Sequence, residues 1–304
     1  MAPPCARARW LRATEPARPR QASITMYETP ELPEHVNAPE RHPLLDFARV
    51  FLTVAAVFGG ILVAAWWSAS WLARQTPFAW EQKLVGDNIL GPFDVQTDDG
   101  RSVALQALAD RLSSQMGLPP EMSIAVHYSD SDVANAFATL GGHVVITQGL
   151  LDSVQTENGL AMVLAHEIAH VQHRDPAGSI GGAVAMALLI GFVSGSDADL
   201  SSLGANLTQL SFSRAQERSA DDAALAALLA SYGHTGGAAE FFEHVLESGD
   251  DAIGSLIPGF LSTHPHVEDR LEQIRQSQRS GDDDLVTPLP AALGGPEVAA
   301  ERET

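Results

Sequence analysis

The residues best suited to chemistry form the run His166-Glu167-Ile168-Ala169-His170. Residues four apart on a helix share a face, so both imidazoles can reach one metal ion. Glu167 would then lie beside the metal, where a carboxylate can take a proton from a water whose pKa the metal lowers. The motif therefore predicts zinc-dependent hydrolysis. Two histidines at this spacing also occur in ordinary helices, so the motif alone leaves a structural role open.

A third ligand is available downstream, because catalytic zinc usually takes three protein ligands and keeps one position for water. The helical stretch 213–221 carries Glu217 and Asp221 four residues apart. Two antiparallel helices would present both histidines and Glu217 to one zinc ion per chain. Asp221 would accept the remaining ring N–H of a ligand histidine. The chain's single cysteine, Cys5, excludes a cysteine-based zinc cluster and an intrachain disulfide.

Four segments together resemble one family. They are HEIAH at 166–170, SRAQERSAD at 213–221, NAFATLGGHVVIT at 135–147, and Ser-Thr-His-Pro at 262–265 followed by Arg270. In this order and spacing they are similar to the HtpX-like and CAAX-prenyl-protease-like zinc metallopeptidases, peptidase family M48. The resemblance covers about residues 85–276. It implies that His166, His170 and Glu217 bind zinc, that Glu167 is the catalytic base and that Asp221 supports a ligand.

The same resemblance implies a fold and a way of holding substrate. We expect a mostly helical α+β, gluzincin-like domain with a small sheet beside the catalytic helix. An edge strand of that sheet would pair with an extended polypeptide through backbone hydrogen bonds. The edge candidates are residues 135–140 and 143–147, which place Asn135, Gly142 and His143 at the substrate.

His264 is predicted to lie near the zinc, from the resemblance of its segment to the Ser-Thr-His-Pro motif. It would either stabilise the developing oxyanion or occupy the open coordination position in a resting state. The alternative is that Ser262 or Thr263 caps a helix and that His264 is structural. His173, one turn after His170, is expected to be a surface residue and not a ligand.

The N-terminal region predicts a membrane anchor. Residues 1–46 are rich in proline and arginine and are expected to be a disordered leader. Residues 50–73 are 24 uncharged residues, long enough to cross a bilayer, so we assign a single transmembrane helix to residues 47–74. Because arginines accumulate before it, we expect the N-terminus inside and the catalytic domain on the extracytoplasmic side.

The metallopeptidase domain is assigned to residues 80–278 and a disordered acidic tail to residues 279–304. Within the domain we expect a helix over 103–116, a strand over 122–128 and mainly helices after 157. Residues 177–195 form a second apolar run. A complete membrane crossing there would separate the two halves of the proposed zinc site. We therefore expect a buried or membrane-dipping helix.

The net charge of the chain limits the kinds of partner that it can bind. The net charge is −20, and residues 74–304 carry 11 Lys and Arg against 32 Asp and Glu, which excludes a nucleic-acid partner. The leading hypothesis is a membrane-anchored zinc metalloendopeptidase acting on unfolded or misassembled proteins, a quality-control role that rests only on the resemblance. The alternatives are a chaperone-like binding module with a gated or silent zinc site, and a zinc hydrolase of small non-peptide substrates.

Overall fold

The computed structural model describes residues 42–85, 95–96, 100–195, 211–251, 260 and 263–295. The chain divides into two compact units, Met1–Val54 and Ala55–Thr304. In the first unit the described residues form the start of helix α1. The second unit contains the rest of that helix and all other described elements.

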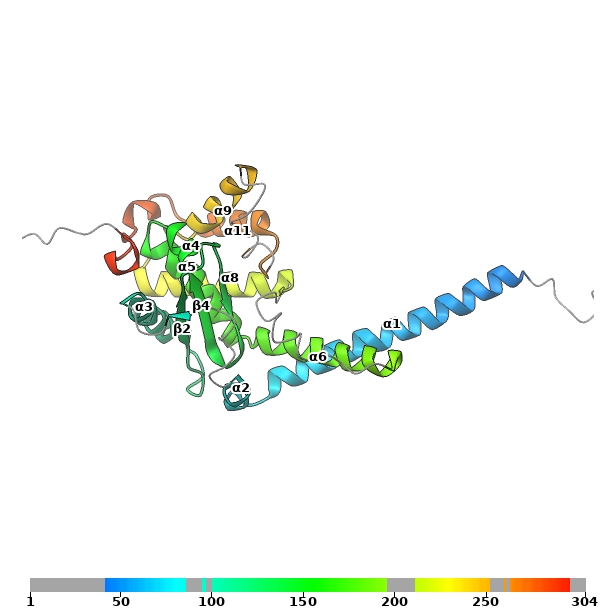
Figure 1. The fold of residues 1–304 in the computed structure, drawn as a ribbon. Helices are drawn as coiled ribbons and strands as arrows, with labels where there is room; N and C mark the ends of the chain where they lie inside the picture. The colour runs from blue at the N-terminus through cyan, green and yellow to red at the C-terminus, as the bar shows by residue number, and fades with distance from the viewer. Residues whose placement is uncertain are drawn as a thin grey trace, which may run out of the picture. The chain divides into compact units, whose positions relative to one another are not determined.

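The described part of the second unit is mostly helical with one small sheet, which confirms the expected α+β class (Figure 1). The helices are α1 (Pro43–Gln75), α2 (Phe78–Val85), α3 (Gly100–Met116), α4 (Gln148–Asp152), α5 (Glu157–Gln172), α6 (Asp175–Ser194), α8 (Arg214–Tyr232), α9 (Glu240–Asp251) and α11 (Val267–Ser277). The strands are β1 (Val95–Gln96), β2 (Ala125–Ser129), β3 (Ala136–Ala138) and β4 (His143–Thr147).

The sheet has the order β1-β2-β4-β3, with β2 and β4 parallel and β3 antiparallel to β4. β3, which follows Asn135, is therefore an edge strand. The expectation that residues 143–147 could form the edge is wrong, because β4 is paired on both sides. Gly142 makes the tight turn: its φ is +83°, and a Cβ would lie 2.0 Å from the Ser123 carbonyl oxygen. After this turn, His143 begins β4, which lies between β2 and β3.

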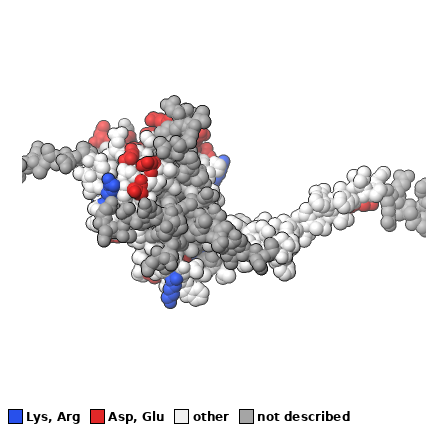
Figure 2. Space-filling model, viewed as in Figure 1, with Lys and Arg blue, Asp and Glu red and all other residues white. Residues whose placement is uncertain are grey.

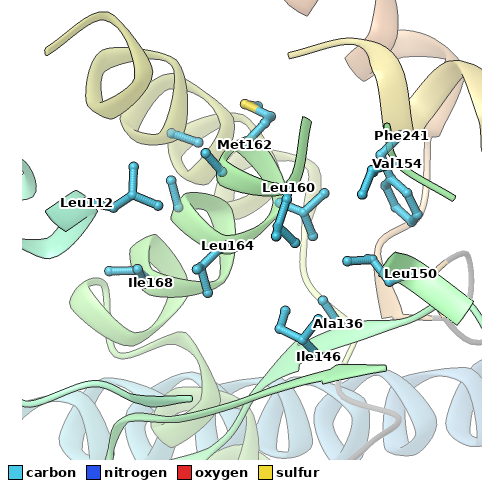
Figure 3. Packing of buried hydrophobic residues seen from close by; sticks show 14 of the residues in the cluster. Leu112, Ala136, Ile146, Leu150, Val154, Leu160, Met162, Leu164, Ile168 and Phe241 are labelled. Carbon is cyan, nitrogen blue, oxygen red and sulfur yellow. The ribbon is translucent and has the colours of Figure 1, made fainter. Parts of the chain in front are cut away.

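α5 is the central helix of the domain. Thr156 caps it by accepting a hydrogen bond from Gly159 N–H, and every residue from Asn158 to Val171 is buried. Figure 3 shows its leucines packing against side chains from α3, the sheet and α9. Because the helix is surrounded, its polar residues near the C-terminal end must find partners inside the protein.

α8 packs on α5 and presents Glu217 and Asp221 to it. Ser213 and Gln216 form a capping box at its start, and Gly233, with a φ of +81°, ends it. These signals fix where the helix begins and therefore which of its faces meets α5. α11 follows His264 and packs on both α8 and α9.

Within the described part of the chain, two helices are long and apolar enough to cross a membrane, α1 and α6. α1 begins at Pro43, so the assignment of residues 43–46 to a disordered leader is wrong; residues 1–41 lie outside the described part of the chain. The expected second apolar helix is present as α6. Of the residues in its most apolar 18-residue segment, only 22% are buried, so α6 is not an ordinary core helix.

The acidic tail also differs from expectation. Residues 279–295 form two short 3-10 turns, Asp282–Leu285 and Ala291–Leu293, and Leu289 and Leu293 are buried in the core. The Asp282 carboxylate accepts hydrogen bonds from the backbone N–H groups of Thr235 and Arg279. The acidic run therefore satisfies backbone donors, and the leucines after it supply apolar surface to bury. Residues 296–304 lie outside the described chain.

Candidate metal centre

Four buried side chains converge at the centre of the domain: His166 and His170 from α5, Glu217 from α8, and His264 just before α11. Their potential ligand atoms all lie within 4.8 Å of one another. The Nε2 atoms of His166 and His170 are 3.0 Å apart, and they lie 3.5 and 3.7 Å from the Glu217 carboxylate oxygens. A tetrahedral ion about 2.0–2.1 Å from each ligand separates the ligand atoms by about 3.3 Å. The spacing fits a single small cation.

A carboxylate orients each of the two α5 histidines. His166 Nδ1 lies 2.9 Å from Asp221 Oδ1, and His170 Nδ1 lies 2.9 Å from Asp175 Oδ2. A ring whose Nδ1–H is donated to a carboxylate has its lone pair on Nε2. Both lone pairs therefore point to the space that Glu217 also faces. The sequence predicted such support from Asp221 but did not identify Asp175.

The converging groups are electron-rich and favour a positive charge between them. Burial and Arg270 disfavour a charged imidazole at His166, yet the hydrogen bonds and charges of Asp221 and Glu217 raise its pKa to about 9. Burial lowers the pKa of His170 to about 4 and that of His264 to about 3, so both rings are neutral at pH 7. A cation bound between these groups would take the place of the His166 proton, and neutral imidazoles with a carboxylate are the donors that bind transition metals.

Glu167 lies outside this set of four but next to it. It is 0% exposed, and its Oε1 is 3.3 Å from His264 Nε2. Neither carboxylate oxygen has a hydrogen-bond partner among the described residues. Burial raises the pKa of Glu167 to about 7. A carboxyl group with that pKa can both accept and return a proton near neutral pH.

His264 touches both halves of the site. Its Nδ1 is 3.2 Å from Glu217 Oε1 and 3.3 Å from His166 Nε2, while its Nε2 faces Glu167. The ring is 0% exposed and stacks on Phe260, with centroids 4.6 Å apart. The structure thus places a fourth donor atom among the three that the sequence assigned as ligands. His173 lies at the end of α5 and is not among the four residues of the cluster.

Arg270 of α11 forms ion pairs with α8 beside the cluster of four residues. Its side chain is 3% exposed, and its Nε and Nη2 lie 2.8 and 2.7 Å from the Asp221 carboxylate oxygens. Nη1 lies 2.8 Å from Glu217 Oε2. One guanidinium therefore contacts both Glu217 and Asp221 of α8. The planar fork of arginine suits such bidentate pairing.

Asp175 is the functional candidate that sequence reasoning missed. Arg174 has a φ of +59° and ends α5, so the chain turns and the first residue of α6 faces back to His170. Asp175 Oδ1 also accepts a hydrogen bond from Gln216 and lies 3.3 Å from Arg74 Nη2. An acidic residue five positions after a ligand histidine was the available signal. A continuous helix would have carried it to another face.

These contacts give a prediction about metal affinity. Glu217→Ala should abolish tight metal binding, and Asp175→Ala should weaken it by about 10–100-fold, because His170 loses its orienting acceptor. Zinc titration against a chromophoric chelator measures both. Asp222→Ala on the exposed side of α8, where Asp222 accepts a hydrogen bond from Gln273, is the control and should bind as wild type. Unchanged affinity in Asp175→Ala would refute its positioning role.

Comparisons with known proteins agree with this site. The model of peptidase family M48 matches residues 100–278, more than half of the chain. A protease HtpX homolog of Acidiphilium cryptum is 37% identical over 142 residues, covering 38% of this chain and 48% of that protein. A protease HtpX homolog of Polynucleobacter necessarius is 30% identical over 228 residues, covering 62% and 77%.

A third relative is the mitochondrial metalloendopeptidase OMA1 of Schizosaccharomyces pombe, 30% identical over 156 residues, covering 50% of this chain and 45% of that protein. The chain thus spans less than half of the length of the Acidiphilium and Schizosaccharomyces relatives. The matched residues, 100–278, include His166, Glu167 and His170 of α5 and the whole of α8, which carries Glu217. The chain belongs to peptidase family M48 and carries a metalloprotease domain.

Proposed function

We propose that the protein is a membrane-anchored zinc endopeptidase that cleaves unfolded or misassembled polypeptides. The observation that carries the proposal is the buried convergence of His166, His170 and Glu217 beside the buried carboxylate of Glu167. A zinc ion held by the three ligands would polarise the scissile carbonyl and acidify the attacking water. The donor types, their separation and their carboxylate supports all fit that ion.

Glu167 is the proposed general base. Its carboxylate would accept the proton of the attacking water and pass it to the leaving amine nitrogen. His264 Nε2 lies 3.3 Å from Glu167 Oε1, and burial raises the pKa of Glu167 to about 7, so the carboxylate can take up a proton near neutral pH. Asp221 and Asp175 would hold the ligand histidines in place during this transfer.

β3 is the proposed substrate-binding edge. It is the outer strand on one side of the sheet, it packs on α5, and it is followed by the Gly141-Gly142 turn. A polypeptide added to this edge would gain backbone hydrogen bonds whatever its sequence. Asn135 precedes the edge strand and is retained as a substrate contact, whereas Gly142 and His143 would act by fixing the turn. Broad recognition of this kind suits unfolded chains.

His264 is proposed to close the resting site. Its Nδ1 lies where a fourth ligand would be, and both it and Glu167 are inaccessible to a polypeptide in this conformation. His264→Ala should therefore raise basal turnover of a short unfolded peptide, measured as initial rate per bound metal. His173→Ala is the control and should leave the rate unchanged. A fall of roughly 10²–10³-fold would instead identify His264 as an oxyanion donor.

The proposed location is a membrane, with α1 as a single-pass anchor and the catalytic domain outside the cytoplasm. The support is the length and hydropathy of α1 together with the arginine-rich leader. Protease protection of the C-terminal domain in sealed vesicles of known orientation measures the side. A quality-control role follows from the sequence-independent edge and the gated site. A chaperone-like binding module with a silent site is the competing proposal.

The deciding experiment uses the full chain in lipid vesicles with an unfolded soluble protein as substrate. Internal cleavage products, identified by mass spectrometry, are expected with zinc, should vanish after chelation and should return when zinc is added. The folded form of the same substrate is the control and should be cut more slowly. Binding of the unfolded substrate without cleavage at any metal loading would favour the chaperone-like module.

A further inference from the structure

α6 starts at the metal centre and continues away from it as an apolar helix without a charged residue after Asp175. Several large apolar side chains on it remain exposed: Leu188 by 51%, Ile190 by 53%, Phe192 by 85% and Val193 by 59%. Exposing apolar area to water costs about 25 cal/mol per Å², and contiguous patches of this kind mark contact surfaces. The C-terminal half of α6 therefore needs an apolar neighbour.

The first half of α6 packs on the C-terminal half of α1. A Cβ at Gly178 would lie 2.4 Å from Arg74 Nε, and one at Gly182 would lie 2.6 Å from Ser70 Oγ. The contacts move towards the start of α1 as they move towards the end of α6, so the helices are antiparallel (Figure 1). Small residues at such an interface allow the close backbone approach by which helices associate in lipid.

The surroundings of this helix pair identify its neighbour. The adjoining part of α1 has the same character: Trp67 is 73% exposed and Trp71 65%. On the face seen in Figure 2, the surface over the two helices carries no charged groups beside α6. α1 is the proposed anchor, so an apolar face continuous with it meets the same solvent. We propose that α6 is a second membrane-embedded helix, whose exposed C-terminal half contacts the acyl chains of the bilayer.

The connections of α6 show that it dips into the membrane without leaving the catalytic side. α5 before it and α8 after it supply ligands to one cluster, so the chain must return after α6. The sequence between α6 and α8, residues 195–213, contains Asp197 and Asp199 and is too polar for a second membrane-spanning helix. Since Asp175 begins α6, the membrane-embedded segment and the orienting partner of His170 belong to one helix.

Site-specific quenching by lipid tests the proposal. Cys5→Ser removes the only thiol. Single cysteines then replace Phe192 on α6, Val57 on α1 and Leu229 on α8, which is 45% exposed and serves as the control in water. Each full-length variant carries a polarity-sensitive fluorophore in phosphatidylcholine–phosphatidylglycerol vesicles, with or without brominated acyl chains. We expect quenching at positions 192 and 57 and none at 229.

The outcomes separate this proposal from membrane anchoring. Quenching at 57 without quenching at 192 would leave the α1 anchor standing and refute lipid contact by α6. Oxidative cross-linking at 192 between two chains, without quenching, would show that a second copy covers the face and would equally refute it. Metal content equal to wild type in each variant shows that the labelled domain is folded.

Discussion

Glu167→Gln is expected to lower the rate of peptide cleavage by on the order of 10²-fold or more while metal content stays at the wild-type value. The amide cannot accept the proton of the attacking water, so the chemical step loses its base. The four residues whose donor atoms converge do not include Glu167. Cleavage of a quenched fluorescent peptide, with bound metal determined on the same sample, measures both quantities.

Glu157→Gln is the matched control for Glu167→Gln, since it removes the same charge from the same helix. Glu157 lies in the first turn of α5, where it pairs with Arg111. Ten residues of helix separate the two positions by about 15 Å. This control should retain turnover and metal. Loss of metal from Glu167→Gln would show that Glu167 is a ligand, and undiminished cleavage would show that another group is the base.

Arg270→Ala is expected to destabilise the domain by about 3–5 kcal/mol, because it leaves buried carboxylates without their counter-charge. Arg270 is the cation that contacts both Asp221 and Glu217, and its guanidinium also lies 4.8 Å from the centre of the Phe242 ring. Denaturant-induced unfolding of the full chain in detergent, with metal in excess, measures the loss. Metal affinity should fall as well, since Asp221 orients His166.

Arg275→Ala on the same helix is the control. Arg275 is 53% exposed and its partner Glu243 is 40% exposed, with 2.7 Å between Nη2 and Oε1. Exposed ion pairs contribute about 0–1 kcal/mol, so this variant should unfold close to wild type. Equal destabilisation by the two substitutions would mean that the buried position of Arg270 has no special energetic role.

The sequence by itself predicted which side chains meet at the centre. Helical periodicity places residues four apart on one face, and this rule paired His166 with His170 and Glu217 with Asp221. The local pattern likewise predicted helices after residue 157 and over residues 213–221, as the structure has them in α5 and α8. Length and lack of charge predicted a membrane helix at residues 50–73. All of these features are local, so they can be read without knowing which helix meets which.

Only the tertiary structure decided which partners complete the site. Arg270 reaches Asp221 from 49 residues along the chain, and His264 reaches Glu217 from 47. The turn at Arg174, which brings Asp175 to His170, depends on a left-handed residue that no periodicity encodes. Such contacts follow from how α5, α8 and α11 pack together. Burial then enforces them, because a polar group enclosed in this core must find a partner.

The same distinction explains the corrections. The sequence of residues 143–147 would suit an inner strand or an edge strand equally well. Pairing with both β2 and β3 makes β4 an inner strand. The tail after residue 279 looks disordered by composition, yet Leu289 and Leu293 find an apolar surface prepared by the rest of the core. α6 has the composition of a core helix or a membrane helix. Its packing on α1 through glycines, with large apolar side chains left exposed, supports the proposed membrane contact.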